Sequence, residues 1–205
     1  MLVVLHWIMK AKRAKTNETA ESSEIEEAEE NRAAFADIAG YDTAKRELES
    51  AVSGLKNRDK TTGVLLYGSA DTEKSMLAAA AAASAGVPLF AVSAKTYISK
   101  YAGYAFEFVK FLYQQARKST PCVVFIDDID AIGGAGEDSD SEAYRARKAL
   151  LSELGDNNSG VLTIAATNRL SDFDPALLDR FACKIEISLP DEKHTNTQGN
   201  PADDA

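Results

Sequence analysis

Residues 63–86, "GVLLYGSADTEKSMLAAAAAASAG", decide the fold class of this chain. Residues 63–67 form a short apolar run that predicts a buried strand. The alanine-rich run that follows predicts a helix ending at Gly86, because alanine is the strongest helix former and glycine is favoured just after a helix. A strand, a glycine-containing loop and a helix in this order are typical of an α/β protein that binds phosphate at the loop.

The loop itself, "GSADTEKS" at 68–75, matches most of the phosphate-binding pattern G-x-x-x-x-G-K-[ST]. Gly68, Lys74 and Ser75 stand at the required positions, but Glu73 stands where the pattern has glycine. In such a loop the backbone N–H groups surround the phosphates, the lysine contacts the terminal phosphates and the hydroxyl ligates Mg²⁺. The position between a buried strand and a helix makes a chance match improbable.

Strand and helix patterns alternate through residues 35–190. The expected strands are 63–67, 87–93, 122–127, 161–167 and 184–190. The expected helices start at Asp42, span 105–118, run from a capping box of Ser139 and Glu142 to Leu154, and cover 175–180. This alternation predicts a P-loop α/β fold with a five-stranded parallel sheet and helices on both faces. No G-x-G-x-x-G follows the first strand, so a dinucleotide-binding domain fits less well.

Polar residues end two other predicted strands. Asp127 is the last residue of the apolar run "CVVFID", and Asp128 follows it directly. Asn168 directly follows the run "VLTIAAT". In parallel sheets, ligands bind beyond the carboxyl ends of the strands. We therefore expect Asp127 to serve a metal ion and Asp128 to polarise an attacking water.

Composition limits the function classes. The chain has 205 residues, of which 45% are hydrophobic and 27% charged, as in soluble globular proteins. A net charge of −9 argues against a nucleic-acid or anionic-membrane surface on the folded body. Cys122 and Cys183 predict free thiols in a reducing compartment, which favours the cytoplasm. The histidines, His6 and His194, form no H-E-x-x-H, so proteolysis by this chain is excluded.

The chain divides into four segments: an apolar and then basic N-terminus (1–15), an acidic linker (16–34), the folded body (35–190) and a polar tail (191–205). Both linker and tail are expected to be disordered. The apolar run at 1–9 is short of the ~20 residues that span a bilayer. Two interpretations stay open: an interfacial or frayed helix, or the inner end of a transmembrane helix with a basic cytoplasmic flank. Membrane contact is expected only through 1–15.

The sequence resembles the AAA family of ATPases. "FADIAGYDTAKREL" (35–48) is similar to the segment before the family's first helix, and "GVLLYGSADTEKS" to its Walker A strand and loop. "PCVVFIDDIDAIG" (121–133) is similar to Walker B, and "VLTIAATNRLSDFDPALLDRF" (161–181) to the sensor 1 and arginine-finger region. Order and spacing match, most closely to the membrane-anchored, FtsH-like AAA proteases, which favours the transmembrane interpretation of 1–15.

The resemblance implies ATP and Mg²⁺ as ligands, an oligomeric ring of like or unlike subunits, typically a hexamer, and a protein substrate. The implied ATP-binding residues are Ile38, Ala39, Gly68, Ser69, Ala70, Asp71, Thr72, Glu73, Lys74, Ser75 and Met76. The implied catalytic residues are Lys74, Asp128, Asn168 as γ-phosphate sensor and Arg180 as arginine finger. Ser75 and Asp127 would hold the metal, and Tyr101 and Gly103 would form the substrate-gripping pore loop.

Four departures from the family pattern put catalysis in question. Asp71 and Glu73 replace glycines, and like charges 4 Å apart cost about 1 kcal/mol in water and about 4 kcal/mol at an effective dielectric of 20. Asp128 replaces a glutamate and is one methylene shorter, and Ala182-Cys183 replaces a second arginine. The family's helical lid and the metalloprotease domain are not expected within these 205 residues.

The sequence leaves two functional hypotheses open, and a third interpretation is a decayed gene product without a function. One is an AAA ATPase module with impaired activity that couples ATP binding and hydrolysis to protein remodelling. The other is a pseudo-ATPase, a non-catalytic structural or regulatory partner of intact AAA subunits.

Overall fold

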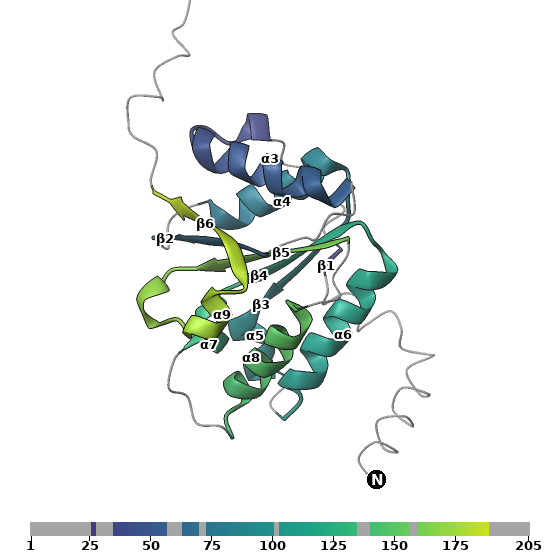
Figure 1. Cartoon of the computed structure of the whole chain (residues 1–205), viewed down its shortest axis with the longest axis vertical. Coiled ribbons are helices and arrows are strands. Elements are labelled where there is room, and N and C mark those ends of the chain that lie inside the picture. Colours follow the sequence, from purple (N-terminus) through teal and green to yellow (C-terminus); the bar gives the residue numbers. More distant parts are fainter. Residues whose placement is uncertain are drawn as a thin grey trace, which may run out of the picture.

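Five parallel strands form the centre of the computed structural model (Figure 1). They are β2 (Gly63–Gly68), β3 (Leu89–Ser93), β4 (Cys122–Asp127), β5 (Val161–Thr167) and β6 (Phe181–Ile187), in the order β3-β4-β5-β2-β6. All neighbouring pairs among them are parallel, which confirms the fold expected from the sequence. The structure describes residues 26–27, 35–56, 63–69, 73–100, 103–134, 140–155 and 160–188.

One further strand lies at the edge of this sheet. β1 (Glu26–Glu27) pairs antiparallel with β3, so two residues of the predicted acidic linker join the sheet. The predictions for 1–15, for the rest of the linker, for 191–205 and for Ala70, Asp71, Thr72, Tyr101 and Ser139 concern residues outside the described ranges.

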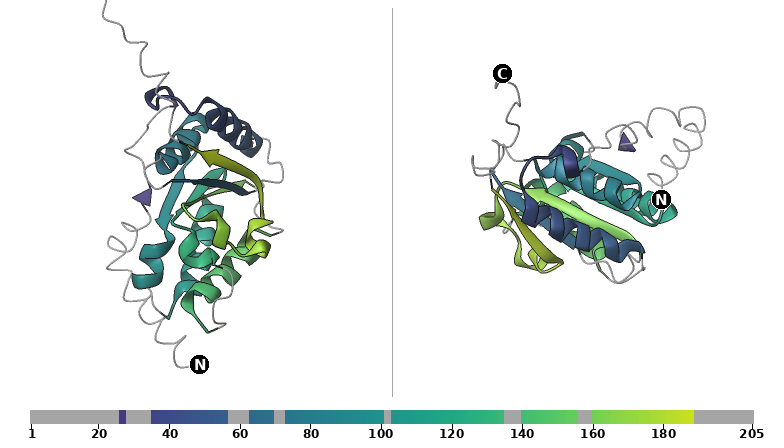
Figure 2. Two further views of the ribbon diagram at one scale, coloured as in Figure 1. Left: turned by 90° about the vertical axis from the view of Figure 1, so that its left-hand side faces the viewer. Right: turned by 90° about the horizontal axis from the view of Figure 1, so that it is seen from above.

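Helices cover both faces of the sheet (Figures 1 and 2). On one face lie the short 3-10 turn η2 (Phe35–Asp37), α3 (Asp42–Lys56) and α4 (Lys74–Ala85). On the other lie α5 (Ala94–Lys100), α6 (Ala105–Lys118), α7 (Asp130–Gly133), α8 (Glu142–Glu153), the turn η3 (Leu170–Asp172) and α9 (Pro175–Leu178). Each face has its own apolar core, because the strands between them are buried on both sides.

The apolar spacing of α3 explains its packing. Ala44, Leu48, Val52 and Leu55 recur at helical spacing, and all four are buried against α4 and the sheet. The buried alanines of α4 keep this contact close. The α4 helix ends at Gly86, whose φ of 65° is the left-handed conformation that glycine adopts most readily.

The start of α8 differs from the sequence prediction. Ser141, rather than Ser139, caps this helix, since the Tyr144 N–H donates to its Oγ at 3.1 Å. Glu142 is therefore the first residue of α8, and its side chain contacts α6. Its Oε2 accepts the Ala105 N–H at 3.2 Å, at the N-terminus of α6.

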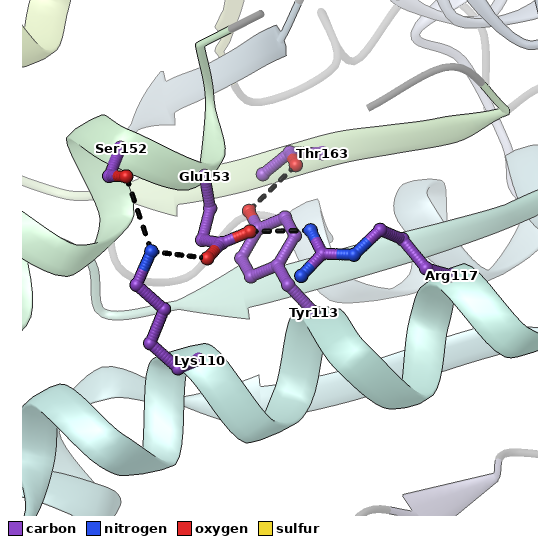
Figure 3. Close-up of polar contacts among 6 residues, drawn as sticks. All are labelled: Lys110, Tyr113, Arg117, Ser152, Glu153 and Thr163. Atoms are coloured by element: carbon purple, nitrogen blue, oxygen red, sulfur yellow. Dashed lines mark hydrogen bonds and ion pairs between the residues drawn. The ribbon is translucent and has the colours of Figure 1, made fainter. Parts of the chain in front are cut away.

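A polar cluster ties α6 to α8 and to the sheet (Figure 3). Glu153 is 6% exposed and pairs with Lys110 at 2.7 Å and Arg117 at 2.5 Å. Beside it, the fully buried Tyr113 shares a 2.8 Å hydrogen bond with Thr163 of β5. Burial alone would raise the pKa of Glu153, but the hydrogen bonds and charges of Arg117 and Lys110 outweigh it and lower the pKa.

Candidate nucleotide site

The sheet brings three polar strand ends together at its carboxyl edge. β5 lies between β2, which ends at Gly68, and β4, which ends at Asp127. Thr167 at the end of β5 is in register with Tyr67 of β2. The loop and the acidic pair predicted from separate motifs therefore follow the two strands that flank β5.

Lys74 is the buried cation of this site. It is 5% exposed, and its Nζ donates to the carbonyl oxygens of Ser69 at 2.7 Å and Gly68 at 3.3 Å. Its charge also stabilises the ionised form of Asp127. The ammonium group thus contacts the end of β2 and lies within electrostatic reach of Asp127 at the end of β4.

Asp127 is half-buried at the end of β4. Burial is the main reason that the pKa of its carboxyl is raised, and the charges of Asp128 and Asp130 add to this. The charge of Lys74 and the Asp128 N–H, which donates to Asp127 Oδ1 at 2.8 Å, oppose the shift without cancelling it. A divalent cation would favour the ionised carboxylate and so couple strongly to this group.

Asp128 has an unusual backbone conformation. Its φ of 48° is left-handed, which is uncommon for any residue other than glycine, although aspartate tolerates it better than most. Its Oδ2 accepts a 3.2 Å hydrogen bond from Ser93, at the end of β3. The carboxylate that would orient a water is therefore directed to a neighbouring strand end.

A second hydrogen-bond network joins the end of β5 to α7, the short helix that follows β4. The Thr167 hydroxyl donates to Asp130 Oδ1 at 3.1 Å and accepts the Arg169 N–H at 3.0 Å. Ser93, Asp130 and Thr167 were not among the site residues predicted from the sequence. Each is nevertheless a polar residue at or just after the end of an apolar strand, and that signal identifies them.

Glu73 carries a carboxylate side chain at the position where the phosphate-loop pattern has glycine. It is the residue before α4, yet its side chain does not cap the helix. Its Oε2 is buried and has no hydrogen-bond partner among the described residues. Tyr41, at the start of α3, lies close enough for the Glu73 charge to raise the pKa of its hydroxyl, after the larger effect of burial.

The remaining predicted residues occupy different environments. Ile38 is buried in the α3–α4 core and its carbonyl accepts from Lys45, whereas Ala39 is exposed. Ser75 and Met76 are exposed on the first turn of α4. Asn168 is exposed directly after β5, beside Thr167.

Two predicted residues lie away from the carboxyl edge. Arg180 is exposed between α9 and the amino end of β6. Gly103 is exposed just before α6 and has a left-handed φ of 88°. It lines a surface pocket of about 500 Å³, together with residues of α6 and α8.

The donor set suits Mg²⁺. Mg²⁺ prefers oxygen ligands and commonly binds through one or two carboxylates, phosphates and water. Ser75 and Asp127 supply a hydroxyl and a carboxylate on neighbouring elements. Within the described ranges, no three His, Cys, Asp or Glu side chains gather to form a complete metal cage, so phosphates and water would complete the ligand set.

Comparison with known proteins tests the origin of this arrangement. Residues 64–189 match the model of the ATPase family associated with various cellular activities (AAA). The chain belongs to the AAA family. The match covers the strand ends, the phosphate loop and Arg180 in one continuous segment of this AAA domain.

Two similar curated proteins are much longer than this AAA domain. The ATP-dependent zinc metalloprotease FtsH of Myxococcus xanthus is 40% identical over 179 residues, which cover 80% of this chain and 28% of that protein. FtsH 2 of Symbiobacterium thermophilum is 41% identical over 208 residues, covering 93% of this chain and 35% of that protein. The chain therefore spans about a third or less of these relatives.

Solved structures agree with the fold. The crystal structure of the FIGL-1 AAA domain has a TM-score of 0.70 and 30% identity, and covers 80% of this chain and 58% of that one. The same domain in complex with ADP has a TM-score of 0.68 and 30% identity, covering 78% and 57%. Among the described helices of this AAA domain, none is long and apolar enough to cross a membrane.

Proposed function

We propose that this AAA domain binds ATP with Mg²⁺, hydrolyses it slowly, and uses the cycle within a ring assembly to remodel protein substrates. The observation that carries the proposal is the position of Lys74, which begins the helix after β2 and lies within electrostatic reach of Asp127 at the end of β4, next to Asp128. Relatives named as ATP-dependent, and a similar domain solved with ADP, support the choice of ligand.

Each residue has a role that follows from its place. Lys74 would turn from the Gly68 and Ser69 carbonyls to the terminal phosphates, and Ser75 and Asp127 would hold Mg²⁺. The bound metal would neutralise charge that develops on the phosphates. Asp128 would orient the attacking water, although its bond to Ser93 and its short side chain slow this step.

Asn168 would contact the γ-phosphate from the end of β5, and Arg180 would reach a nucleotide on a neighbouring subunit. Tyr101 and Gly103 would contact the protein substrate. We also propose a cytoplasmic location, with residues 1–15 as the point of membrane contact. Vesicle flotation of the full chain and of a variant lacking 1–15 tests this: equal flotation contradicts it.

Calorimetric titration with ATP and Mg²⁺ tests nucleotide binding. We expect weak binding by the natural chain, binding about tenfold or more tighter in Glu73→Gly, and none in Lys74→Ala. Phosphate release measured on the same samples should follow the same order. Failure of both the natural chain and Glu73→Gly to bind ATP would overturn the proposal.

One observation favours a second function, that of a non-catalytic partner of intact AAA subunits. The left-handed backbone of Asp128 and the Ser93 hydrogen bond hold the carboxylate at a neighbouring strand end. This function predicts phosphate release no faster than that of Lys74→Ala, together with stable association with a catalytically intact AAA subunit.

A further inference from the structure

Arg147 of α8 is a buried cation to which the proposed function assigns no role. Its side chain is 6% exposed, and its Cζ lies 5.4 Å from the ring centroid of Tyr144 on the same helix. Its Nη1 donates to the carbonyl of Gly134, directly after α7, and its Nε lies 3.8 Å from Oδ2 of Asp174, directly before α9. One side chain therefore joins α7, α8 and α9, which lie together on one face of the sheet (Figure 1).

The end of α7 is also joined directly to the segment before α9. The Asp174 N–H donates to the Gly133 carbonyl at 2.7 Å, and Gly134 forms an antiparallel bridge with Phe173. The buried Phe173 ring lies so close to Gly133 that a Cβ atom there would be 2.8 Å from it. Because α7 closely follows the acidic end of β4, this junction connects that strand end to the segment that leads to Arg180.

The two carboxylate oxygens of Asp174 have different partners. Its Oδ1 caps α9 by accepting the Ala176 N–H at 2.8 Å and the Leu177 N–H at 3.2 Å, whereas its Oδ2 faces Arg147. The Arg180 N–H in turn donates to the Leu177 carbonyl at 3.1 Å. The position of this carboxylate thus affects the start of α9 and, through that short helix, the backbone of Arg180.

The other end of α8 lies beside the Arg180 side chain. Gly155 follows the last turn of α8, and a Cβ atom there would lie 3.9 Å from Nη1 of Arg180. α8 therefore holds residues 174–180 at two places, at Asp174 through Arg147 and at Arg180 beside Gly155.

Stability is a weak explanation for a buried arginine at this position. The desolvation of a buried ion pair often offsets its Coulomb attraction, so well-packed apolar side chains in its place are often as stabilising. A buried pair can instead fix one arrangement of the elements that it joins. Arginine suits this purpose, because its planar guanidinium carries several donors in fixed directions and can bond a carbonyl and a carboxylate together.

We propose that Arg147 is a positioning residue for Arg180. By holding Gly134 and Asp174 together, it fixes residues 174–180 and so keeps Arg180 in place for the nucleotide of a neighbouring subunit. This inference rests on the proposed function, because it concerns the rate of ATP hydrolysis in an assembly. It predicts a larger effect on phosphate release at saturating ATP than on the Kd of ATP, because Arg180 acts across the subunit interface.

Arg147→Met tests the contact, because methionine keeps an unbranched apolar chain and removes the guanidinium. The first measurement is hydrogen exchange without nucleotide at the amides of Asp174, Ala176 and Leu177. We expect about tenfold faster exchange there, the effect of one charged hydrogen bond, and less than about twofold at the amides of β5, which report on the whole sheet. Arg145→Met, at an exposed arginine of the same helix, is the matched control and should change neither.

Equal changes at both sets of amides in Arg147→Met would overturn the positioning role, since they would show a general loss of stability. The second measurement is phosphate release at saturating ATP and Mg²⁺. We expect Arg147→Met to slow it about tenfold with a similar Kd for ATP, and to slow it no further when combined with Arg180→Ala. Additive losses, or a rise in Kd as large as the fall in rate, would overturn the link to Arg180.

Asp174→Asn is a second variant that tests the same contact from α9. Asparagine caps a helix about as well as aspartate, but it lacks the charge that faces Arg147. It should reproduce the faster exchange of the Ala176 and Leu177 amides, and natural exchange rates there would overturn the proposal. If the natural chain and Glu73→Gly both bind no ATP, the proposed function fails, whereas the exchange measurements still test whether Arg147 holds this segment.

Discussion

At the scale of the residue, Gly68 shows why the first position of the loop is restricted. A Cβ atom there would lie 2.0 Å from the Ile187 carbonyl oxygen, so any side chain would separate β2 from β6. We expect Gly68→Ala to lower the free energy of unfolding by about 1–3 kcal/mol or more, as overpacking does. Urea unfolding would measure this.

Gly54 offers the matched control for that substitution. It lies inside α3, and a Cβ atom there would meet nothing within 4 Å. Gly54→Ala should therefore raise the free energy of unfolding by about 0.4–1 kcal/mol. Equal effects of the two substitutions would show that β2 and β6 can separate without cost.

Asp128 is the residue at which side-chain length is testable. If ATP is hydrolysed here, Asp128→Glu should raise the rate of phosphate release by about tenfold to a hundredfold, because the longer side chain restores roughly 1 Å of reach. Asp128→Asn keeps a residue that tolerates the left-handed backbone and removes the charge, so it should release no phosphate above the Lys74→Ala background. A slower Asp128→Glu would show that reach is not the defect.

At the scale of the element, Glu153 links α6 and α8 in a pH-dependent way. Its folded-state pKa lies below the ordinary 4.5, so the ionised form stabilises the fold above that pH. This stabilisation is lost as the pH falls below 4.5 and through the folded-state pKa. Because Lys110 and Arg117 are about a third exposed, we expect Glu153→Gln to cost about 1–3 kcal/mol at neutral pH.

The measurement is urea unfolding from neutral pH down to pH values below 4.5. The natural chain and Glu153→Gln should differ at neutral pH and converge at the acid end. Glu107→Gln, at an exposed glutamate of α6, should stay within about 0.5 kcal/mol throughout. A constant difference at all pH values would contradict the role of the carboxylate charge.

Substitutions at Ser139 and Ser141 distinguish the cap of α8 expected from the sequence from the cap in the structure. Ser141→Ala should cost about 1 kcal/mol, because it removes the acceptor of the Tyr144 N–H. Thermal unfolding monitored by circular dichroism would detect the loss. If Ser139→Ala costs as much and Ser141→Ala nothing, the capping box expected from the sequence is right.

The sequence predicts the bounds of an element well when a local residue pattern defines them, and less well when contacts with distant segments do. β4 and α6 have the expected bounds, because one apolar run and one periodic run define them locally. β6 begins at Phe181, earlier than the expected 184, because Phe181 is buried in register with Gly63 of a distant strand. α5 was not expected, and its buried Tyr97 stacks on Phe108 of α6 at 4.9 Å, another contact that local patterns do not contain.

The candidate site likewise contains residues that local motifs predict and a contact that they do not. Motifs predicted Lys74 and Asp127 as residues of one site, because each ends or follows an apolar strand of a parallel sheet. The approach of Tyr41 to Glu73 could not be predicted in this way. It depends on how α3 packs against α4 and on a left-handed backbone that tyrosine rarely adopts.

At the scale of the whole molecule, assembly is the property to measure. If the domain forms a ring, light scattering should show a larger mass with ATP and Mg²⁺ than without. Lys74→Ala, which should not bind ATP, is the control and should stay small. A persistent monomer in all conditions would contradict the roles proposed for Arg180 and Tyr101.

The pairing of β2 with β6 has a consequence for symmetry. Gly68 aligns with Ile187 at one end of the pair, and Arg180 precedes Phe181 at the other, about 20 Å away at 3.3 Å per residue. A nucleotide at the loop is thus beyond the reach of the Arg180 in the same chain. If that arginine contacts the loop of a second copy, each copy contributes both partners of the contact, about 20 Å apart on its surface. Both contacts then form at one interface in a twofold pair, or at two separate interfaces in a closed ring.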